Sequence, residues 1–169
     1  MRVAILTTGG TIEKVYDETD GSLRNMGSGL VQIMGVLRLS NLIWRHIAVM
    51  SKDSLEMNDD DRGLILAAVR DALATEDAVI VLHGTDTLSQ TGELLHANLP
   101  ELNKPVVLSG AMRPFIFRDT DAYQNLTEAL LACRLLTAGV YVVMHGQALR
   151  FPGVVKDRRH LTFSRQAST

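Results

Sequence analysis

Short apolar runs alternate with longer helical patterns along this chain of 169 residues, and this alternation limits the folds that the chain can adopt. The runs are rich in β-branched residues and show no polar alternation, which is typical of strands buried on both faces of a sheet. Strands of this kind that alternate with helices predict an α/β fold, a mainly parallel sheet with helices on both faces. The expected strands are residues 2–8, 47–51, 78–84, 105–110 and 139–146.

Two strong helical patterns, residues 59–75 and 120–137, lie between the expected strands, and residues 29–39 and 87–98 form two weaker ones. The first strong pattern has an acidic first turn with Asn58 or Asp59 as the cap, and we expect Gly139 to close the second. Helical spacing predicts the inward-facing residues to be Leu64, Ala67, Ala68 and Ala72 in the first helix and Leu126, Leu130, Cys133 and Leu136 in the second.

The composition excludes several classes of protein. A 46% hydrophobic chain of this length is sufficient for one core, so we expect residues 1–169 to form a single domain. The net charge of -2 provides no basic field for nucleic acid. No apolar run approaches the roughly 20 residues of a membrane span. The N-terminus lacks a signal-peptide pattern, and the only cysteine, Cys133, has no disulfide partner, so we expect a cytoplasmic protein.

Two segments have the composition of irregular structure. Residues 15–28 are polar and contain glycine, which is typical of a mobile surface loop. The tail from about residue 157 is consistent with either an edge strand or a disordered end.

Three polar turns directly follow expected strands. They are "TTGGT" at 7–11, "HGTDT" at 83–87 and "SGAMRP" at 109–114. In an open parallel sheet, ligands bind outside the carboxyl ends of the strands. We therefore expect the three turns to converge at one edge of the sheet and to form a site there.

Each of these turns also has a purely structural interpretation. The glycines of "TTGGT" fit an ordinary turn, and their spacing does not match the known phosphate-binding patterns. Asp86 is placed either to cap a helix or to act as a carboxylate in a site. Lys156 is either an ordinary surface lysine or a base close to a hydroxyl. A hydroxyl nucleophile, such as Thr11 or Thr85, needs a base and oxyanion donors, and these residues together would provide them.

"TTGGTI" at 7–12 and "HGTDT" at 83–87 together resemble the bacterial-type L-asparaginases. The resemblance continues through "SLEMND" at 54–59, "PVVLSGAMRP" at 105–114, the helix around Asn125, and "GVVKD" at 153–157. It implies the Rossmann-like three-layer fold of the N-terminal domain of that family. It also implies hydrolysis of L-asparagine to L-aspartate and ammonia without a metal or an organic cofactor.

The resemblance assigns roles to individual residues. Thr11 resembles the nucleophile, and Tyr16 is the candidate for the tyrosine that assists it. Thr85, Asp86 and Lys156 resemble a second triad, in which the threonine activates water, the lysine is its proton partner and the aspartate binds the α-amino group. The matching substrate-binding positions are Gly10, Ser54 for the α-carboxylate, Leu55, Gly84, and Ala111 beside the leaving amide.

The chain departs from the family at two places. Family members are longer and have a C-terminal domain that lends an acidic residue to a neighbouring subunit, so we expect a short, single-domain form and a homodimer or higher homo-oligomer. Leu55 replaces a residue that is often polar, which bears on substrate preference. Two alternatives stay open: a hydrolase of glutamine or another small amide, and a non-catalytic module that binds amino acids.

Overall fold

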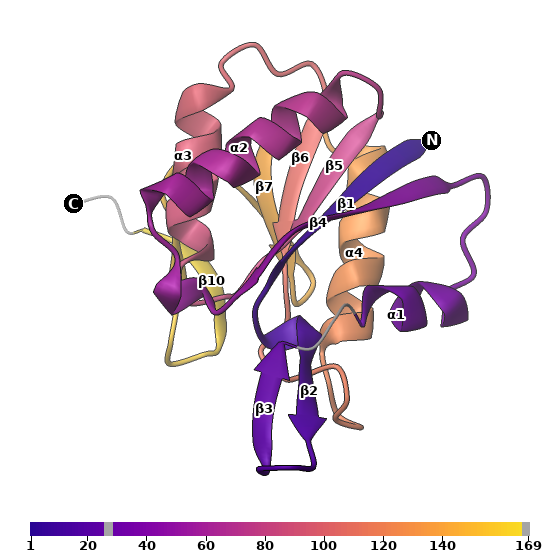
Figure 1. The fold of residues 1–169 in the computed structure, drawn as a ribbon. Coiled ribbons are helices and arrows are strands. Elements are labelled where there is room, and N and C mark those ends of the chain that lie inside the picture. The colour runs from indigo at the N-terminus through magenta and orange to yellow at the C-terminus, as the bar shows by residue number, and fades with distance from the viewer. Residues whose placement is uncertain (26–28, 167–169) are drawn as a thin grey trace.

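The computed structural model describes residues 1–25 and 29–166, and its centre is a twisted six-stranded sheet (Figure 1). All neighbouring strands are parallel except the last pair, so the predicted mainly parallel sheet is confirmed. In order across the sheet the strands are β4 (Ile43–Lys52), β1 (Arg2–Gly9), β5 (Ala78–Leu82), β6 (Pro105–Ser109), β7 (Gly139–Met144) and β8 (Gln147–Arg150).

Helices cover both faces of the sheet, as the sequence predicts. Alternate residues of the central strands pack against α1 (Leu30–Val36) and α4 (Ala122–Leu135) on one face. The residues between them pack against α2 (Asp59–Leu73) and α3 (Leu88–Asn98) on the other face. The three layers are visible in Figure 1. None of the described helices combines the length and the apolar character that crossing a membrane requires.

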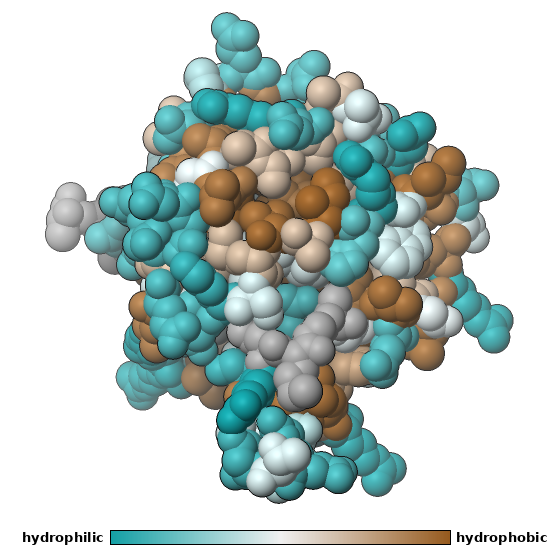
Figure 2. All heavy atoms as spheres, in the orientation of Figure 1, coloured by the Kyte–Doolittle hydropathy of each residue, from teal (hydrophilic) through white to brown (hydrophobic). Residues whose placement is uncertain are grey.

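The three central strands are buried along their whole length, whereas β4 is half-exposed. The prediction that residues 47–51 are buried on both faces is therefore wrong. β4 is an edge strand, paired only with β1 among the described strands, so part of its surface faces solvent. In Figure 2, which has the orientation of Figure 1, apolar residues gather in the middle of the visible surface, over α2 and β4.

The inward face of α2 differs from the prediction by one position. Ile65, Val69 and Ala72 are buried, whereas Leu64 is 58% exposed and Ala67 is exposed too. Asn58 sets the start of the helix through a reciprocal capping box with Asp61. Ile65, Val69 and Ala72 therefore form the contact with the sheet, so the predicted role of Ala72 is confirmed and that of Leu64 is wrong.

The inward face of α4 agrees with the prediction. Leu126, Leu130 and Cys133 are buried, and burial raises the pKa of the Cys133 thiol to about 12, as expected for a small buried hydrophobe. Gly139, however, does not close this helix, which ends at Leu135. It is instead the first residue of β7, where its φ of 154° suits a glycine.

Two hairpins lie beside the sheet. The first corrects a prediction, because the expected mobile loop contains β2 (Lys14–Asp17) paired with β3 (Ser22–Asn25), and residues 26–28 of that prediction lie outside the described residues. In the second, β9 (Val154–Asp157) pairs with β10 (Thr162–Arg165), so the edge-strand alternative for the tail is confirmed at residues 162–165. Aspartates that accept backbone N–H groups stabilise both turns, a signal that composition alone does not reveal.

A buried imidazole lies where β5 ends. His83 is fully buried, with Nδ1 2.8 Å from the Gly84 carbonyl and Nε2 2.9 Å from the Thr91 hydroxyl. Burial penalises the charged ring and lowers the pKa of His83 to about 4. The neutral ring donates from Nδ1 and accepts at Nε2, so it joins β5 to α3 directly behind the "HGTDT" turn.

Two helix-interior glycines provide a matched test of the packing. A Cβ on Gly92 of α3 would lie 2.1 Å from Cζ of the buried Phe151, whereas a Cβ on Gly63 of α2 would meet nothing within 4 Å. We expect Gly92→Ala to lower the free energy of unfolding by roughly 1–3 kcal/mol, because the core is already full. We expect Gly63→Ala to raise it by about 0.5–1 kcal/mol through helix propensity. Urea denaturation measures both values, and equal effects of the two substitutions would contradict this packing.

His83 also predicts a dependence of stability on pH. An unfolded histidine titrates near its ordinary pKa, so below about pH 6.5 the unfolded chain binds a proton that the folded chain excludes. The contribution of His83 is therefore complete above this pH and declines as the pH falls to about 4. We expect denaturation curves of the wild type to lose up to about 3 kcal/mol more across this window than those of His83→Gln. Parallel pH dependences in the two proteins would disprove the assignment.

Candidate active site

Two of the predicted turns and Ser54 meet in direct backbone contact beyond the carboxyl ends of β1 and β5. A Cβ on Gly10 would lie 2.4 Å from the Cα of Gly84, and a Cβ on Gly84 would lie 2.7 Å from both Cβ and Oγ of Ser54. Only glycine permits these approaches, and the φ of Gly10, 84°, also favours it. Two of the three turns predicted to converge, "TTGGT" and "HGTDT", are therefore in contact, and Ser54 lies against the second of them.

The first turn presents Thr11. This residue begins a short 3-10 helix, η1 (Thr11–Glu13), and is partly exposed. The buried Glu13 carboxylate accepts the Gly9 N–H at 2.7 Å and fixes the turn. The hydroxyl of Thr8 donates to the Leu82 carbonyl, and that of Thr7 bonds His46. Among the described residues the Thr11 hydroxyl has no hydrogen-bond partner, so it is free to meet a ligand.

The second turn places a hydroxyl, an ammonium and a carboxylate together. Lys156, on β9, donates to Thr85 Oγ1 at 2.7 Å and to Asp86 Oδ1 at 3.0 Å. The Lys156 side chain is only 13% exposed, so the surface-lysine interpretation is wrong. Thr87 occupies the N-cap position of α3, without a capping bond from its side chain, so the capping interpretation of Asp86 is wrong too. Arg158 also donates to Asp86 Oδ1, at 3.0 Å.

The segment after β4 places Ser54 against Gly84 of the second turn. Ser54 begins a second 3-10 helix, η2 (Ser54–Glu56), is buried, and accepts the Thr87 hydroxyl at its carbonyl oxygen. Asp53 accepts the N–H of Leu55 and a 2.9 Å bond from Lys14, and Lys14 holds the pKa of Asp53 below its ordinary value. Leu55 itself is 67% exposed, so its side chain lies at the surface beside Ser54.

The third turn is held by a buried polar network. A Cβ on Gly110 would lie 2.4 Å from the His83 carbonyl oxygen, so this turn adjoins the second one and the buried Ala111 comes next in the chain. Asn125 donates to the Gly110 carbonyl at 2.9 Å and to Asp121 at 2.7 Å. The position of the backbone around Ala111 is thus set by α4, whose first turns reach this loop.

Asp121 is the centre of that network and was not predicted. Its carboxylate accepts the backbone N–H groups of Met112 and Arg113 and contacts His145 at 2.8 Å. Burial favours the neutral acid, but these hydrogen bonds outweigh it and lower the pKa of Asp121. Lys14, Asp53, Glu13 and Arg158 were missed as well. The only sequence signal for them was a charged residue next to a motif position.

Tyr16 is the one predicted catalytic residue that the structure does not bring to the site. It lies on β2 and is 53% exposed. Its hydroxyl lies 3.6 Å from the position that a Cβ on Gly21 would occupy, at the far turn of the hairpin. No hydrogen bond joins Tyr16 to Thr11 among the described residues.

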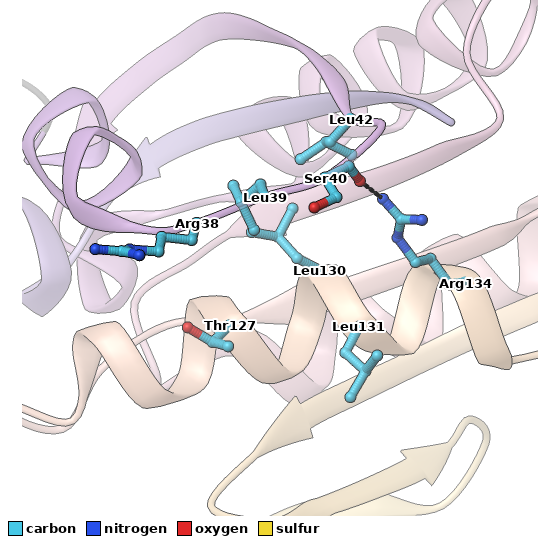
Figure 3. A pocket seen from close by; sticks show the side chains of 8 residues that line it. All are labelled: Arg38, Leu39, Ser40, Leu42, Thr127, Leu130, Leu131 and Arg134. Atoms are coloured by element: carbon cyan, nitrogen blue, oxygen red, sulfur yellow. Dashed lines mark hydrogen bonds between the residues drawn. The ribbon is translucent and has the colours of Figure 1, made fainter.

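The pocket in Figure 3 is separate from these turns. It has a volume of about 310 Å³ and lies between α4 and the segment before β4, where Arg134 donates to the Ser40 carbonyl. Half of the residues that line it are leucines, and none of the predicted site residues is among them. Within residues 1–25 and 29–166, no cluster of three or more histidine, cysteine or acidic side chains is placed to hold a metal ion.

Comparison with known proteins agrees with this arrangement. An L-asparaginase from Thermococcus kodakarensis is 31% identical over 142 residues, which cover 84% of this chain and 43% of that protein. A glutamyl-tRNA(Gln) amidotransferase component from the same organism is 33% identical over 152 residues, covering 86% and 33%. The solved structure of the thermostable L-asparaginase from Thermococcus kodakarensis has a TM-score of 0.89 at 29% identity, covering 98% of this chain and 51% of that chain.

The chain thus spans about half, or less, of the length of these proteins. The family model described as "Asparaginase, N-terminal" matches residues 2–162, which is nearly the whole chain. The chain belongs to the asparaginase family and corresponds to the N-terminal part of its longer members.

Proposed function

We propose that the protein hydrolyses L-asparagine to L-aspartate and ammonia through a threonine nucleophile. The Thr11 hydroxyl attacks the side-chain amide carbon, the C–N bond breaks, and the amide nitrogen leaves as ammonia with the proton from the hydroxyl. A water molecule then attacks the resulting ester, which releases aspartate and restores the Thr11 hydroxyl. Backbone N–H groups of the glycine turns are suited to stabilise the oxyanion in both steps.

The observation that carries this proposal is the contact between the two turns that contain the threonines. A Cβ on Gly10 would lie 2.4 Å from the Cα of Gly84, so the turn that contains Thr11 packs directly against the turn that contains Thr85. Thr85 in turn lies 2.7 Å from the ammonium of Lys156. One hydroxyl is thus available to attack, and a second hydroxyl on the adjoining turn has a proton partner, as a two-step acyl transfer requires.

We assign the second step to Thr85, Lys156 and Asp86. Thr85 takes a proton from the attacking water as it passes its own proton to Lys156 Nζ, which has to be the neutral amine at this point. The bond between the acyl carbon and the Thr11 oxygen then breaks and that oxygen takes up the proton, while Asp86 holds the lysine in place. Ser54, Gly10, Gly84 and the Ala111 backbone are proposed to bind the substrate, and Leu55 to border it. Tyr16 assists Thr11 in this proposal only if the β2–β3 hairpin moves, because its hydroxyl now lies at the far turn.

Removal of the nucleophile tests the first step. We expect Thr11→Ala to lower the rate of ammonia release from asparagine by roughly 1000-fold or more, because no other hydroxyl takes its place. Thr127→Ala, which removes an exposed threonine hydroxyl on α4, is the control and should retain full activity. Normal turnover by folded Thr11→Ala would rule out Thr11 as the nucleophile.

Substitution of Thr85 or Lys156 tests the second step, the hydrolysis of the ester. We expect Thr85→Val and Lys156→Met each to slow turnover by roughly 100-fold or more, because water loses its proton relay. If the ester forms faster than it is hydrolysed in these variants, mass spectrometry of the quenched enzyme will find one aspartyl group on Thr11. Variants that turn over at the wild-type rate would remove these residues from the mechanism.

A second candidate is an amide hydrolase that prefers glutamine. It is favoured by the 33% identity to an amidotransferase component, which is close to the identity with the asparaginase. A non-catalytic amino-acid-binding module is the remaining alternative. Comparison of ammonia release from asparagine and glutamine decides between the enzymes, whereas calorimetry that finds bound, unchanged asparagine after long incubation would support the module.

We also propose a homodimer or higher homo-oligomer in the cytoplasm, with the amino acid as the other partner. Leu131 and Leu135 on α4 are 55% and 72% exposed, and Ile43 on the edge strand is 66% exposed. Apolar surface of this kind is typical of interfaces. Light scattering at micromolar concentration should give a mass above that of one chain, and a monomeric mass would contradict the proposal. The lone buried Cys133 agrees with a reducing compartment.

A further inference from the structure

A histidine that the proposed mechanism does not use lies between the third turn and the β9–β10 hairpin. His145 Nε2 lies 2.8 Å from Asp121 Oδ2, and its Nδ1 lies 3.2 Å from the hydroxyl of Thr162 on β10. In the neutral ring, Nε2 donates to the carboxylate, so Nδ1 accepts from the Thr162 hydroxyl. The backbone N–H of His145 donates to Asn125, which in turn donates to the Gly110 carbonyl. The imidazole therefore bridges β10 to the carboxylate that holds the third turn.

The backbone at His145 shows what the ring adds. His145 and Gly146 form the turn between β7 and β8, with φ angles of 54° and 76°. Two-residue turns with a positive φ at both positions favour asparagine or aspartate followed by glycine. Histidine departs from that preference, and the two nitrogens of its ring bond two groups in different directions. Substitution by asparagine thus suits the backbone but cannot maintain both bonds.

The Asp121 side of the bridge leads to Thr85. Asp121 accepts two backbone N–H groups of the third turn, at 2.9 and 3.0 Å. In the same turn, a Cβ on Gly110 would lie 3.5 Å from Cγ2 of Thr85 and 2.4 Å from the carbonyl oxygen of His83. The turn that Asp121 holds therefore packs against the residue that is proposed to activate water.

The Thr162 side of the bridge leads to Lys156. Strand β10 pairs with β9 so that Phe163, the residue after Thr162, lies opposite Lys156. Gln147 donates to the Phe163 carbonyl and to the Thr162 hydroxyl at 2.9 Å each. The side chains of Gln147 and His145 therefore both hold β10, and β10 sets the position of the strand that carries the lysine.

Thr85 and Lys156 come from distant segments, and their 2.7 Å contact requires the hairpin to stay against the turns. We infer that His145 is a positioning residue for the second step: through its bridge between the third turn and β10, it holds Lys156 within reach of the Thr85 hydroxyl. The inference rests on the proposed amide hydrolysis and adds a residue to its second step. Misplacement of a catalytic group by about 1 Å slows a reaction by up to roughly 100-fold, so loss of the bridge has a measurable effect.

Four variants test the bridge. His145→Asn keeps a residue that tolerates the left-handed backbone, but its side chain is too short to bond Asp121 and Thr162 together. Thr162→Val removes the hydroxyl at the other end of the bridge, and Thr162→Ser keeps it. His96→Asn, which changes an exposed histidine on α3, is the control.

Steady-state kinetics with asparagine separate positioning from general damage. We expect His145→Asn and Thr162→Val to lower kcat by roughly tenfold and KM by the same factor, because the Thr11 ester forms at the normal rate but is hydrolysed more slowly. Mass spectrometry of these two quenched variants should then find the aspartyl group on Thr11. Thr162→Ser and His96→Asn should retain the wild-type constants.

General damage has a different kinetic result. A smaller folded fraction lowers kcat and leaves KM unchanged, and this outcome would overturn the inference. Wild-type constants in either His145→Asn or Thr162→Val would overturn it too.

Hydrogen exchange separates this inference from the proposed reaction. In His145→Asn and Thr162→Val, the backbone amides that pair β9 with β10 should exchange roughly tenfold faster than in the wild type, whereas those of the buried strand β5 should not change. If asparagine is not hydrolysed but exchange changes in this way, the proposed reaction fails and the role of His145 in holding the hairpin stands. If asparagine is hydrolysed and the hairpin exchanges at the wild-type rate in both variants, the reaction stands and the inference is overturned.

Discussion

The site depends on the close approach of two glycines, Gly10 to the backbone of Gly84 and Gly84 to the side chain of Ser54. Gly10, Gly84 and Ser54 are stacked so closely that a single Cβ on either glycine would collide with its neighbour. This contact joins the carboxyl ends of β1 and β5 to the segment after β4, three stretches that lie far apart in the sequence. The turns that carry Thr11 and Thr85 are therefore packed against each other through Gly10 and Gly84.

Charge pairing gives the site its second constraint. Lys156 is largely buried between the Thr85 hydroxyl and the Asp86 carboxylate. A buried ammonium without a partner is costly, so Asp86 is needed for the lysine to stay in position. The same carboxylate is shared with Arg158, and the acid beside Ser54 is shared with Lys14. The electrostatic character of the site is thus set by cations that lie beyond the residues of the motifs.

The sequence predicted the sheet, its layers and the nearness of the first two polar turns, because buried parallel strands and paired glycine motifs are strong local signals. It failed where the signal was weak or nonlocal. The inward face of α2 was predicted one position away because the spacing of leucine and alanine residues in this helix does not define a single apolar face. The β2–β3 hairpin was predicted to be a mobile loop because a polar composition does not show that Asp17 stabilises a turn. Asp121 and Arg158 were missed because their partners are distant in sequence. The approach of Tyr16 to Thr11 was predicted and is not observed.

The central claim is that the three polar turns form one ligand site. It is tested most directly by a crystal structure of the protein with L-aspartate bound. The account predicts that the ligand lies within hydrogen-bond distance of Thr11, Ser54 and Thr85, with its side-chain carboxylate against the Thr11 hydroxyl. Aspartate bound away from these residues, for example in the pocket beside Arg134 in Figure 3, would contradict it.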